Sequence, residues 1–146
     1  MLCQGSGVGG WSFYLKDGML HYVHNYVRRA LYTVSAPDPV PAGRHQLRFE
    51  FEPTGPPDLA HGQGSPGRAQ LYVDGQLAGQ SDFPVTTPVA FNPGGLSCGR
   101  NPGSAIVADY RAPFPFTGTL RTVTVDLSGD LITDTDSEMR MAMSRQ

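Results

Sequence analysis

The chain has 146 residues, a length that suits one domain, and its 18 Gly and 13 Pro are about twice the ordinary usage. This density of chain breakers excludes a helix bundle or a coiled coil. Charged residues make up 16% of the chain and the net charge is −2, which excludes a basic nucleic-acid binder and an acidic tail protein. No apolar run approaches the roughly 18 residues that a membrane-spanning helix needs, so we expect no membrane partner.

The first half of the chain has the two-residue periodicity of strands. Residues 11–15 and 19–26 flank an Asp17-Gly18 pair, and Asp-Gly between two aromatic-rich runs predicts a type I′ hairpin. Residues 30–35 predict a third strand. Three prolines between residues 37 and 41 then indicate a loop, because proline lacks a backbone donor.

Alternation continues in the second half of the chain. In residues 45–52 apolar and charged side chains alternate strictly, which predicts a half-buried antiparallel strand. A Gly- and Pro-rich loop follows, and then a second hairpin around Asp74-Gly75. The remaining predicted segments are the loop at residues 53–67, the hairpin strands 69–73 and 76–79, and strands at 86–91, 96–99 and 120–127.

These segments predict an all-β antiparallel sandwich over residues 1–130, followed by a helical tail over residues 131–146. Short strands separated by turn signals are typical of sandwiches. In the tail, Thr135 and Glu138 match a capping box, and Met139, Ala142 and Met143 follow at helical spacing. The tail therefore predicts one short C-terminal α-helix.

The two cysteines and the start of the chain bear on its compartment. Residues 1–5 have no basic start and no apolar core, so they do not resemble a signal peptide. Cys3 and Cys98 lie far apart, which disfavours a disulfide framework and suits a reducing compartment. We therefore expect a cytoplasmic protein, and a single Cys3–Cys98 bridge stays open as the alternative.

Three motifs could indicate a cofactor or metal site, but their sequence surroundings do not fit such a site. The run from Gly5 to Gly10 satisfies G-x-G-x-x-G, but a strand follows it where a dinucleotide site needs a helix. His21 and His24 lie three apart on a strand and so face opposite sides, and no other residues complete a zinc set. Asp82 and Asp109 lack the spacing of a calcium loop. No cofactor and no metal are expected.

Aromatic residues in the first strands are the better lead to a binding site. Alternation puts Trp11 on one face of its strand, and Tyr22, His24 and Tyr26 on one face of the next. An exposed aromatic row with His and Asn would hold a sugar ring or a partner surface. The competing interpretation is that most of these aromatics are core. The candidate ligand-binding residues are Trp11, Tyr22, His24, Asn25, Tyr26, Asp109 and Tyr110.

Several strings in order resemble the region that follows the catalytic domain in large bacterial arylsulfatases. They are Gly-Gly-Trp-Ser-Phe-Tyr at 9–14, Tyr-Val-His-Asn-Tyr at 22–26, Pro-Val-Pro-Ala-Gly-Arg-His at 39–45, Leu-Tyr-Val-Asp-Gly at 71–75, Asp-Tyr at 109–110 and Pro-Phe-Pro-Phe-Thr-Gly-Thr-Leu at 113–120. The resemblance covers nearly the whole chain. It implies a concanavalin-like jelly-roll β-sandwich that packs on a catalytic α/β domain.

Sulfate-ester hydrolysis in that family depends on a formylglycine made within Cys/Ser-x-Pro-x-Arg, together with a divalent metal. The run that begins at Cys98 lacks the proline, and the run that begins at Ser35 lacks the arginine. No catalytic residue therefore carries over, and we expect this chain alone to have no enzymatic activity. We expect a non-catalytic accessory domain whose loop at residues 108–111 lines a substrate entrance.

The resemblance also implies a strand before Gly5, which the sequence does not indicate here. An unpaired edge would then remain, and edges of this kind pair with other chains, so a homodimer through that edge is expected. The alternative function is a free-standing carbohydrate- or partner-binding sandwich. A weaker alternative is a remnant reading frame with no function of its own.

Overall fold

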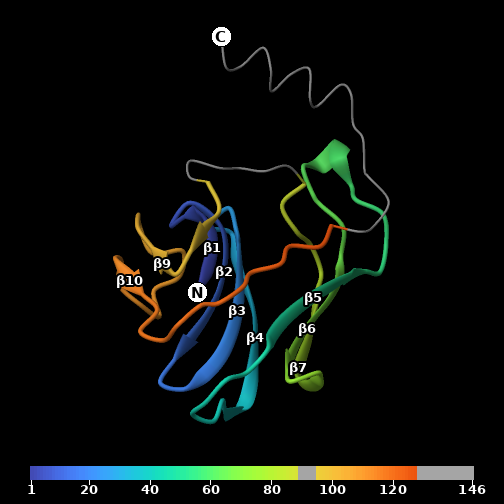
Figure 1. The fold of residues 1–146 in the computed structure, drawn as a ribbon. Coiled ribbons are helices and arrows are strands. Elements are labelled where there is room, and N and C mark those ends of the chain that lie inside the picture. Colours follow the sequence, from blue (N-terminus) through green and yellow to red (C-terminus); the bar gives the residue numbers. More distant parts are fainter. Residues whose placement is uncertain (89–94, 128–146) are drawn as a thin grey trace.

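A computed structural model describes residues 1–88 and 95–127, which form an all-β sandwich of two antiparallel sheets (Figure 1). The first sheet has the strand order β4-β3-β2-β1-β8, and the second has the order β5-β6-β7. The first sheet consists of β1 (Leu2–Ser6), β2 (Gly9–Lys16), β3 (Met19–Tyr26), β4 (Ala30–Pro39) and β8 (Ser97–Cys98).

The second sheet consists of β5 (Leu47–Pro53), β6 (Gly67–Val73) and β7 (Gln76–Phe83). A two-stranded ladder joins β9 (Arg100–Asn101) to β10 (Phe114–Pro115) and lies beside the first sheet (Figure 1). A single 3₁₀ turn, η1 (Leu59–His61), interrupts the Gly- and Pro-rich loop that follows β5. The predicted all-β antiparallel sandwich is confirmed.

Both predicted Asp-Gly hairpins are present. Asp17 and Gly18 have φ of 51° and 81°, and Asp74 and Gly75 have the same pair of values. Positive φ at both central positions is the signature of the type I′ turn, whose twist matches that of the flanking strands. The turn residues therefore fix the register of β2 against β3 and of β6 against β7.

The glycine-rich run near the N-terminus forms a tight hairpin between β1 and β2. Gly5 lies directly opposite Gly10, and both have φ above 100°. A Cβ on Gly10 would lie 2.1 Å from the carbonyl oxygen of Gln4, so only glycine allows the two strands to approach here. The run is thus a strand pairing and not a phosphate loop.

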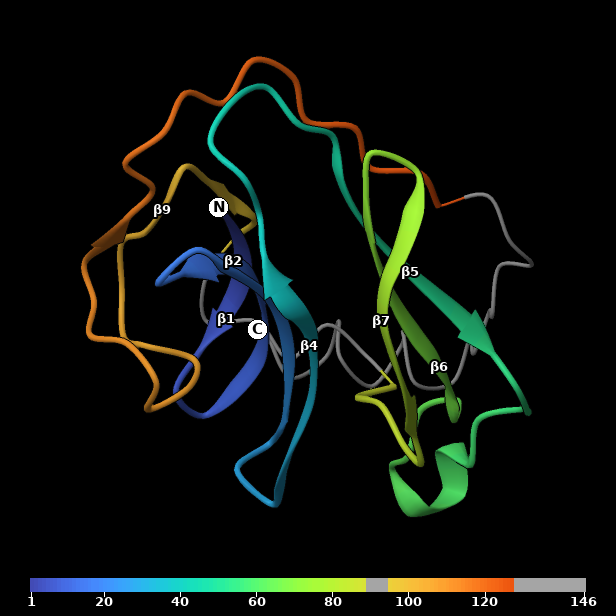
Figure 2. The ribbon, with the colours of Figure 1, turned by 90° about the horizontal axis from the view of Figure 1, so that it is seen from below.

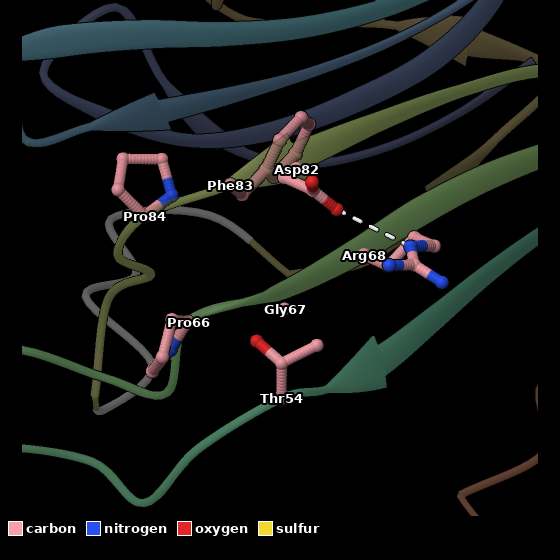
Figure 3. Close-up of a pocket in the computed structure, with 7 residues that line it drawn as sticks. All are labelled: Thr54, Pro66, Gly67, Arg68, Asp82, Phe83 and Pro84. Carbon is pink, nitrogen blue, oxygen red and sulfur yellow. Dashed lines mark hydrogen bonds and ion pairs between the residues drawn. The ribbon is translucent and has the colours of Figure 1, made fainter.

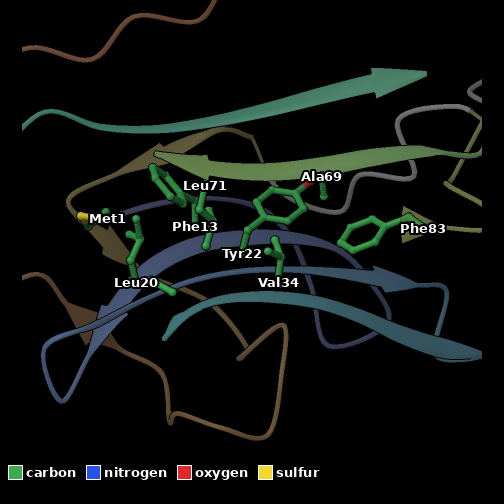
Figure 4. Packing of buried hydrophobic residues seen from close by; sticks show 9 residues of the cluster. Met1, Phe13, Leu20, Tyr22, Val34, Ala69, Leu71 and Phe83 are labelled. Carbon is green, nitrogen blue, oxygen red and sulfur yellow. The ribbon is translucent and has the colours of Figure 1, made fainter. Parts of the chain in front are cut away.

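The main core lies between the two sheets, where aromatic and aliphatic side chains from both inner faces meet (Figure 4). The ring of Tyr22 stacks on Phe49 of the opposite sheet, with centroids 3.6 Å apart and an angle of 8°. Leu20, Ala69 and Leu71 are completely buried. The cluster consists of Met1, Phe13, Leu20, Tyr22, Val34, Ala36, Ala69, Leu71 and Phe83.

The two sheets meet closely along one side, where β4 packs against β7 (Figure 2). A Cβ on Gly79 would lie 2.7 Å from the carbonyl oxygen of Ser35, so the two backbones are almost in contact. At the opposite edge of the second sheet, Leu47, Phe49 and Phe51 of β5 are only half-buried. The core is therefore covered less completely at β5 than at β7.

Several boundaries differ from the sequence prediction. β1 was not predicted, because its short Gly- and Ser-containing run lacks alternation. β4 extends through Pro37 to Pro39, since prolines are tolerated on an edge strand. Residues 120–127 form no strand, and residues 86–88 form only one isolated bridge, from Thr86. The predicted tail helix and residues 89–91 lie outside the described residues.

We expect Gly79→Ala to lower the free energy of unfolding by about 1–3 kcal/mol, because the added methyl group overpacks the contact between β4 and β7. Chemical denaturation monitored by Trp11 fluorescence measures this change. Gly103→Ala is the matched control, since a Cβ there would meet nothing within 4 Å. Equal stability of the two variants would show that the sheets do not touch at Gly79.

Candidate functional site

The predicted aromatic row of β2 and β3 is buried. Tyr22, His24 and Tyr26 are each less than 9% exposed, and Trp11 is half-buried against Tyr22, with ring centroids 6.0 Å apart. Burial raises the pKa of Tyr22 above its ordinary value, because the phenolate would lose its hydration. The expectation of an exposed ligand platform at these residues is therefore wrong. These residues are buried, as the competing interpretation of them as core residues predicted.

His24 holds the segment that follows β7. Its Nε2 atom accepts a hydrogen bond from the backbone N–H of Thr87 at 3.2 Å and lies 3.2 Å from the Thr87 hydroxyl. Burial lowers the pKa of His24 to about 4, because a charged imidazole cannot be hydrated here. The ring is therefore neutral near pH 7 and acts as a hydrogen-bond acceptor.

Asn25 joins three separate turns through one buried side-chain amide. Its Nδ2 atom donates to the carbonyl oxygens of Gly7 (3.3 Å) and Ile106 (2.8 Å). Its Oδ1 atom accepts from the backbone N–H of Arg28 at 2.9 Å. The side chain is 3% exposed, so these contacts leave it no surface for a ligand. Asn25 is a structural residue in this fold.

The loop that contains Asp109 and Tyr110 covers the outer face of the first sheet. Asp109 accepts hydrogen bonds from Lys16 (2.6 Å) and from the Tyr14 hydroxyl (2.9 Å). The hydrogen bond from Lys16 is the main cause that lowers the pKa of Asp109. Burial is the main cause that raises the pKa of Tyr14, and the bond to Asp109 adds to it. Two strand side chains thus anchor the loop through one carboxylate.

Tyr110 completes this attachment from within a small second core. Its hydroxyl donates to Ser12 Oγ and accepts from Asn101 Nδ2, both at 3.0 Å. Its ring stacks on Phe114 at 4.4 Å and meets the edge of Tyr14 at 5.1 Å. Tyr110 is 5% exposed, so its side chain offers almost no accessible surface for the predicted ligand contact. The loop presents the exposed neighbours Ala108 and Arg111 instead.

A polar pair that the sequence pattern did not predict lies beside this loop. The Nδ1 atom of His21 lies 2.7 Å from Ser35 Oγ, because the register of β3 and β4 places the two residues opposite each other. The His21 ring also stacks on Tyr14 at 5.1 Å. Burial lowers the pKa of His21, which keeps it neutral near pH 7. No hydrogen bond from His21 to a carboxylate is among the interactions described for this residue. The pair therefore provides a serine and a histidine, but not the orienting carboxylate of a catalytic triad.

An open groove of about 370 Å³ lies at one end of the second sheet (Figure 3). Its charged groups are Arg68 and Asp82, which form an ion pair at 3.2 Å across β6 and β7. This pairing leaves a nearly neutral surface with mostly apolar walls, typical of a shallow contact site. The lining residues are Thr54, Pro66, Gly67, Arg68, Asp82, Phe83 and Pro84.

Within residues 1–88 and 95–127, no group of three or more His, Cys, Asp or Glu side chains could hold a metal ion. Cys3 is buried and Cys98 is exposed, and both are free thiols. The ladder pairs Cys3 with Ser97 and Leu2 with Cys98, so the two thiols belong to opposite faces of the sheet. This placement does not favour the alternative Cys3–Cys98 bridge.

We expect the free energy of unfolding to fall by about 2 kcal/mol between pH 7 and pH 5 through His24 alone. The unfolded chain binds a proton near pH 6.5, whereas the folded chain binds it only near pH 4. Stability is therefore lost as the pH falls through this window. Denaturation curves at both pH values measure the loss, and His24→Gln should remove that part of it. An unchanged pH dependence in this variant would contradict the assignment.

We expect Asn25→Asp to destabilise the fold by roughly 2–4 kcal/mol, because it replaces two donated bonds with a carboxylate facing two carbonyl oxygens. The change is nearly isosteric, so lost packing does not account for the effect. Thermal and chemical denaturation measure it. Asn101→Asp is a useful comparison, because that side chain joins fewer segments. A stable Asn25→Asp variant would show that the three turns do not depend on this amide.

The chain was compared with family models, with curated proteins and with solved structures, and nothing matches in any of the three. The described residues also form no helix that is long and apolar enough to cross a membrane.

Proposed function

We propose that the chain is a non-catalytic accessory β-sandwich that supports a catalytic α/β domain, as its resemblance to the C-terminal region of bacterial arylsulfatases implies. The observation that carries the proposal is the anchored loop over the first sheet. Asp109 and Tyr110 are committed to holding this loop, and Arg111 extends from it into solvent. A rigid loop with one exposed cation suits a contact between domains.

The polar groups around the loop support a positioning role and not turnover. The Asp109 carboxylate is neutralised by Lys16, and the Tyr110 hydroxyl is hydrogen-bonded on both sides. A jelly-roll topology of the concanavalin type and a cytoplasmic location belong to the same proposal. The free thiols Cys3 and Cys98 support that location, since reducing compartments keep thiols unpaired.

The alternative, a free-standing carbohydrate-binding module, receives no support from the aromatic row. Tyr22, His24 and Tyr26 are buried, so a sugar ring would have no flat surface there. The face of Tyr72, on the outside of the second sheet, is occupied by the Arg48 guanidinium at 4.1 Å. The accessory role is therefore the better supported of the two.

We expect the pure chain to bind the α/β domain of a bacterial arylsulfatase from which its own C-terminal region has been deleted. Arg111→Ala should weaken this binding several-fold, or about 1 kcal/mol, because it removes the exposed group of the loop. Arg44→Ala, at an exposed position between β4 and β5, is the matched control. Isothermal titration measures both affinities. Turnover of an aryl sulfate by the pure chain, or equal effects of the two variants, would contradict the proposal.

A further inference from the structure

Ser35 and His21 face each other on the outer side of the first sheet, and Ser35 is exposed. The turn between β2 and β3 has two residues, so Lys16 and Met19, which flank it, exchange backbone hydrogen bonds. Alternation from this pair directs the backbone groups of His21 toward β2. His21 and Ser35 are therefore a non-hydrogen-bonded pair of β3 and β4, in which side chains lie closest. This register accounts for the 2.7 Å between His21 Nδ1 and Ser35 Oγ.

The backbone N–H of Ser35 points away from β3. In an antiparallel ladder, a non-hydrogen-bonded residue turns its N–H and its C=O to the same outward side. The Ser35 carbonyl oxygen faces β7 on that side, because a Cβ on Gly79 would lie 2.7 Å from it. The N–H of Ser35 is therefore not used by the ladder with β3. In serine proteases the backbone N–H of the nucleophile is one of the oxyanion donors, and the N–H of Ser35 is placed to do the same.

Packing orients the His21 ring. The ring stacks on Tyr14 with centroids 5.1 Å apart, and Tyr14 is buried and fixed by its hydrogen bond to Asp109 at 2.9 Å. Burial is the main cause that lowers the pKa of His21, so the ring is neutral near pH 7. With the proton of the neutral ring on Nε2, Nδ1 is an acceptor for the Ser35 hydroxyl. His21 is thus held as a base beside an exposed hydroxyl.

Three charged groups act on His21, and their balance favours an imidazolium once a proton arrives. The carboxylates of Asp109 and Asp17 favour the charged ring, with Asp109 the stronger of the two, and the ammonium of Lys16 opposes it. Two carboxylates against one ammonium leave a negative surplus around the ring. A proton taken from Ser35 is therefore stabilised on His21, although no carboxylate touches the ring directly.

We propose that Ser35 is a modification site that takes the acyl group of a small activated aryl ester, with His21 as the general base. Ser35 Oγ attacks the carbonyl carbon of the ester and its proton moves to His21 Nδ1. The bond between Oγ and the carbonyl carbon forms, and the bond from that carbon to the aryl oxygen breaks. The phenolate leaves with the electron pair, and His21 releases its proton to the phenolate or to water. The product is an acyl ester on Ser35.

The exposure of Ser35 defines the substrate class. The hydroxyl lies on an open surface, so small acyl groups reach it, and a good leaving group must supply the driving force. This reaction needs no catalytic α/β domain. It is therefore measured on the pure chain, and it can fail without the proposed accessory role, as that role can fail without it.

Acetylation of the whole chain by p-nitrophenyl acetate tests the site, with peptide mass mapping to locate the acetyl group. We expect an acetyl ester on Ser35 that hydroxylamine removes, whereas acetyl amides on Lys16 or the α-amine resist hydroxylamine. Ser104 is the internal control and should stay unmodified, because it is also exposed but its hydroxyl accepts a hydrogen bond from the Gly7 N–H. Acetylation of Ser104 to the same extent as Ser35, or no acetyl ester on Ser35, would overturn the proposal.

The rate of acetylation tests the base. His21→Gln keeps a polar side chain beside Ser35 but no base, and it should slow the reaction at least about ten-fold. In the unaltered chain the rate should fall as the pH drops through the pKa of His21, which lies below its ordinary value, because protonated His21 accepts no further proton. An unchanged rate in His21→Gln would overturn the role of His21.

Ser35→Cys tests the same arrangement with His21 in place. A thiol beside His21 forms a thiolate–imidazolium pair more readily than an isolated thiol. Cys98 of the same chain is exposed and free, so it is the internal reference. Near pH 6.5, iodoacetamide should alkylate the introduced thiol at least about ten-fold faster than Cys98, and His21→Gln in addition should remove this difference. Equal alkylation of the two thiols with His21 present would contradict activation by His21.

Discussion

The first sheet is apolar on both of its faces, and this constraint organises the rest of the molecule. Alternation along β2 and β3 sends Phe13 and Tyr22 to one side and Tyr14 and Val23 to the other. A single opposing sheet covers one side only. The chain therefore uses β5-β6-β7 to cover the inner face and the segment from Arg100 to Phe114 to cover the outer face. Both faces need a covering segment because the adjacent strands β2 and β3 together carry apolar and aromatic side chains on each face.

Polar groups inside this arrangement serve to hold the covers in place. Asn25 ties the outer segment to two turns of the first sheet, and Tyr110 ties it to Ser12 on β2. His24 does the same on the inner side through Thr87. Because each group is buried and bonded, its loss would cost more than its bonds contribute. Among the residues of the anchored loop, Arg111 remains exposed.

The sequence alone predicted the two Asp-Gly hairpins, but it did not predict which strand residues are buried. Asp-Gly pairs determine a local geometry, so Asp17 and Asp74 predicted two turns correctly. Whether His24, Asn25 and Tyr110 are exposed depends on which distant segments cover the sheet, and no local pattern contains that information. For residues 120–127 the alternation predicted a strand, but a strand also needs a partner edge.

Native-state hydrogen exchange on the unaltered chain tests the two-sided burial of the first sheet most directly. The account predicts that the amides of Tyr14 and Val23, which lie under the outer cover, exchange as slowly as those of Ala69 and Leu71 in β6. Both groups would then open only when the whole sandwich unfolds. Fast exchange at Tyr14 and Val23 beside slow exchange in β6 would show that the outer segment does not cover the sheet, and would contradict the account.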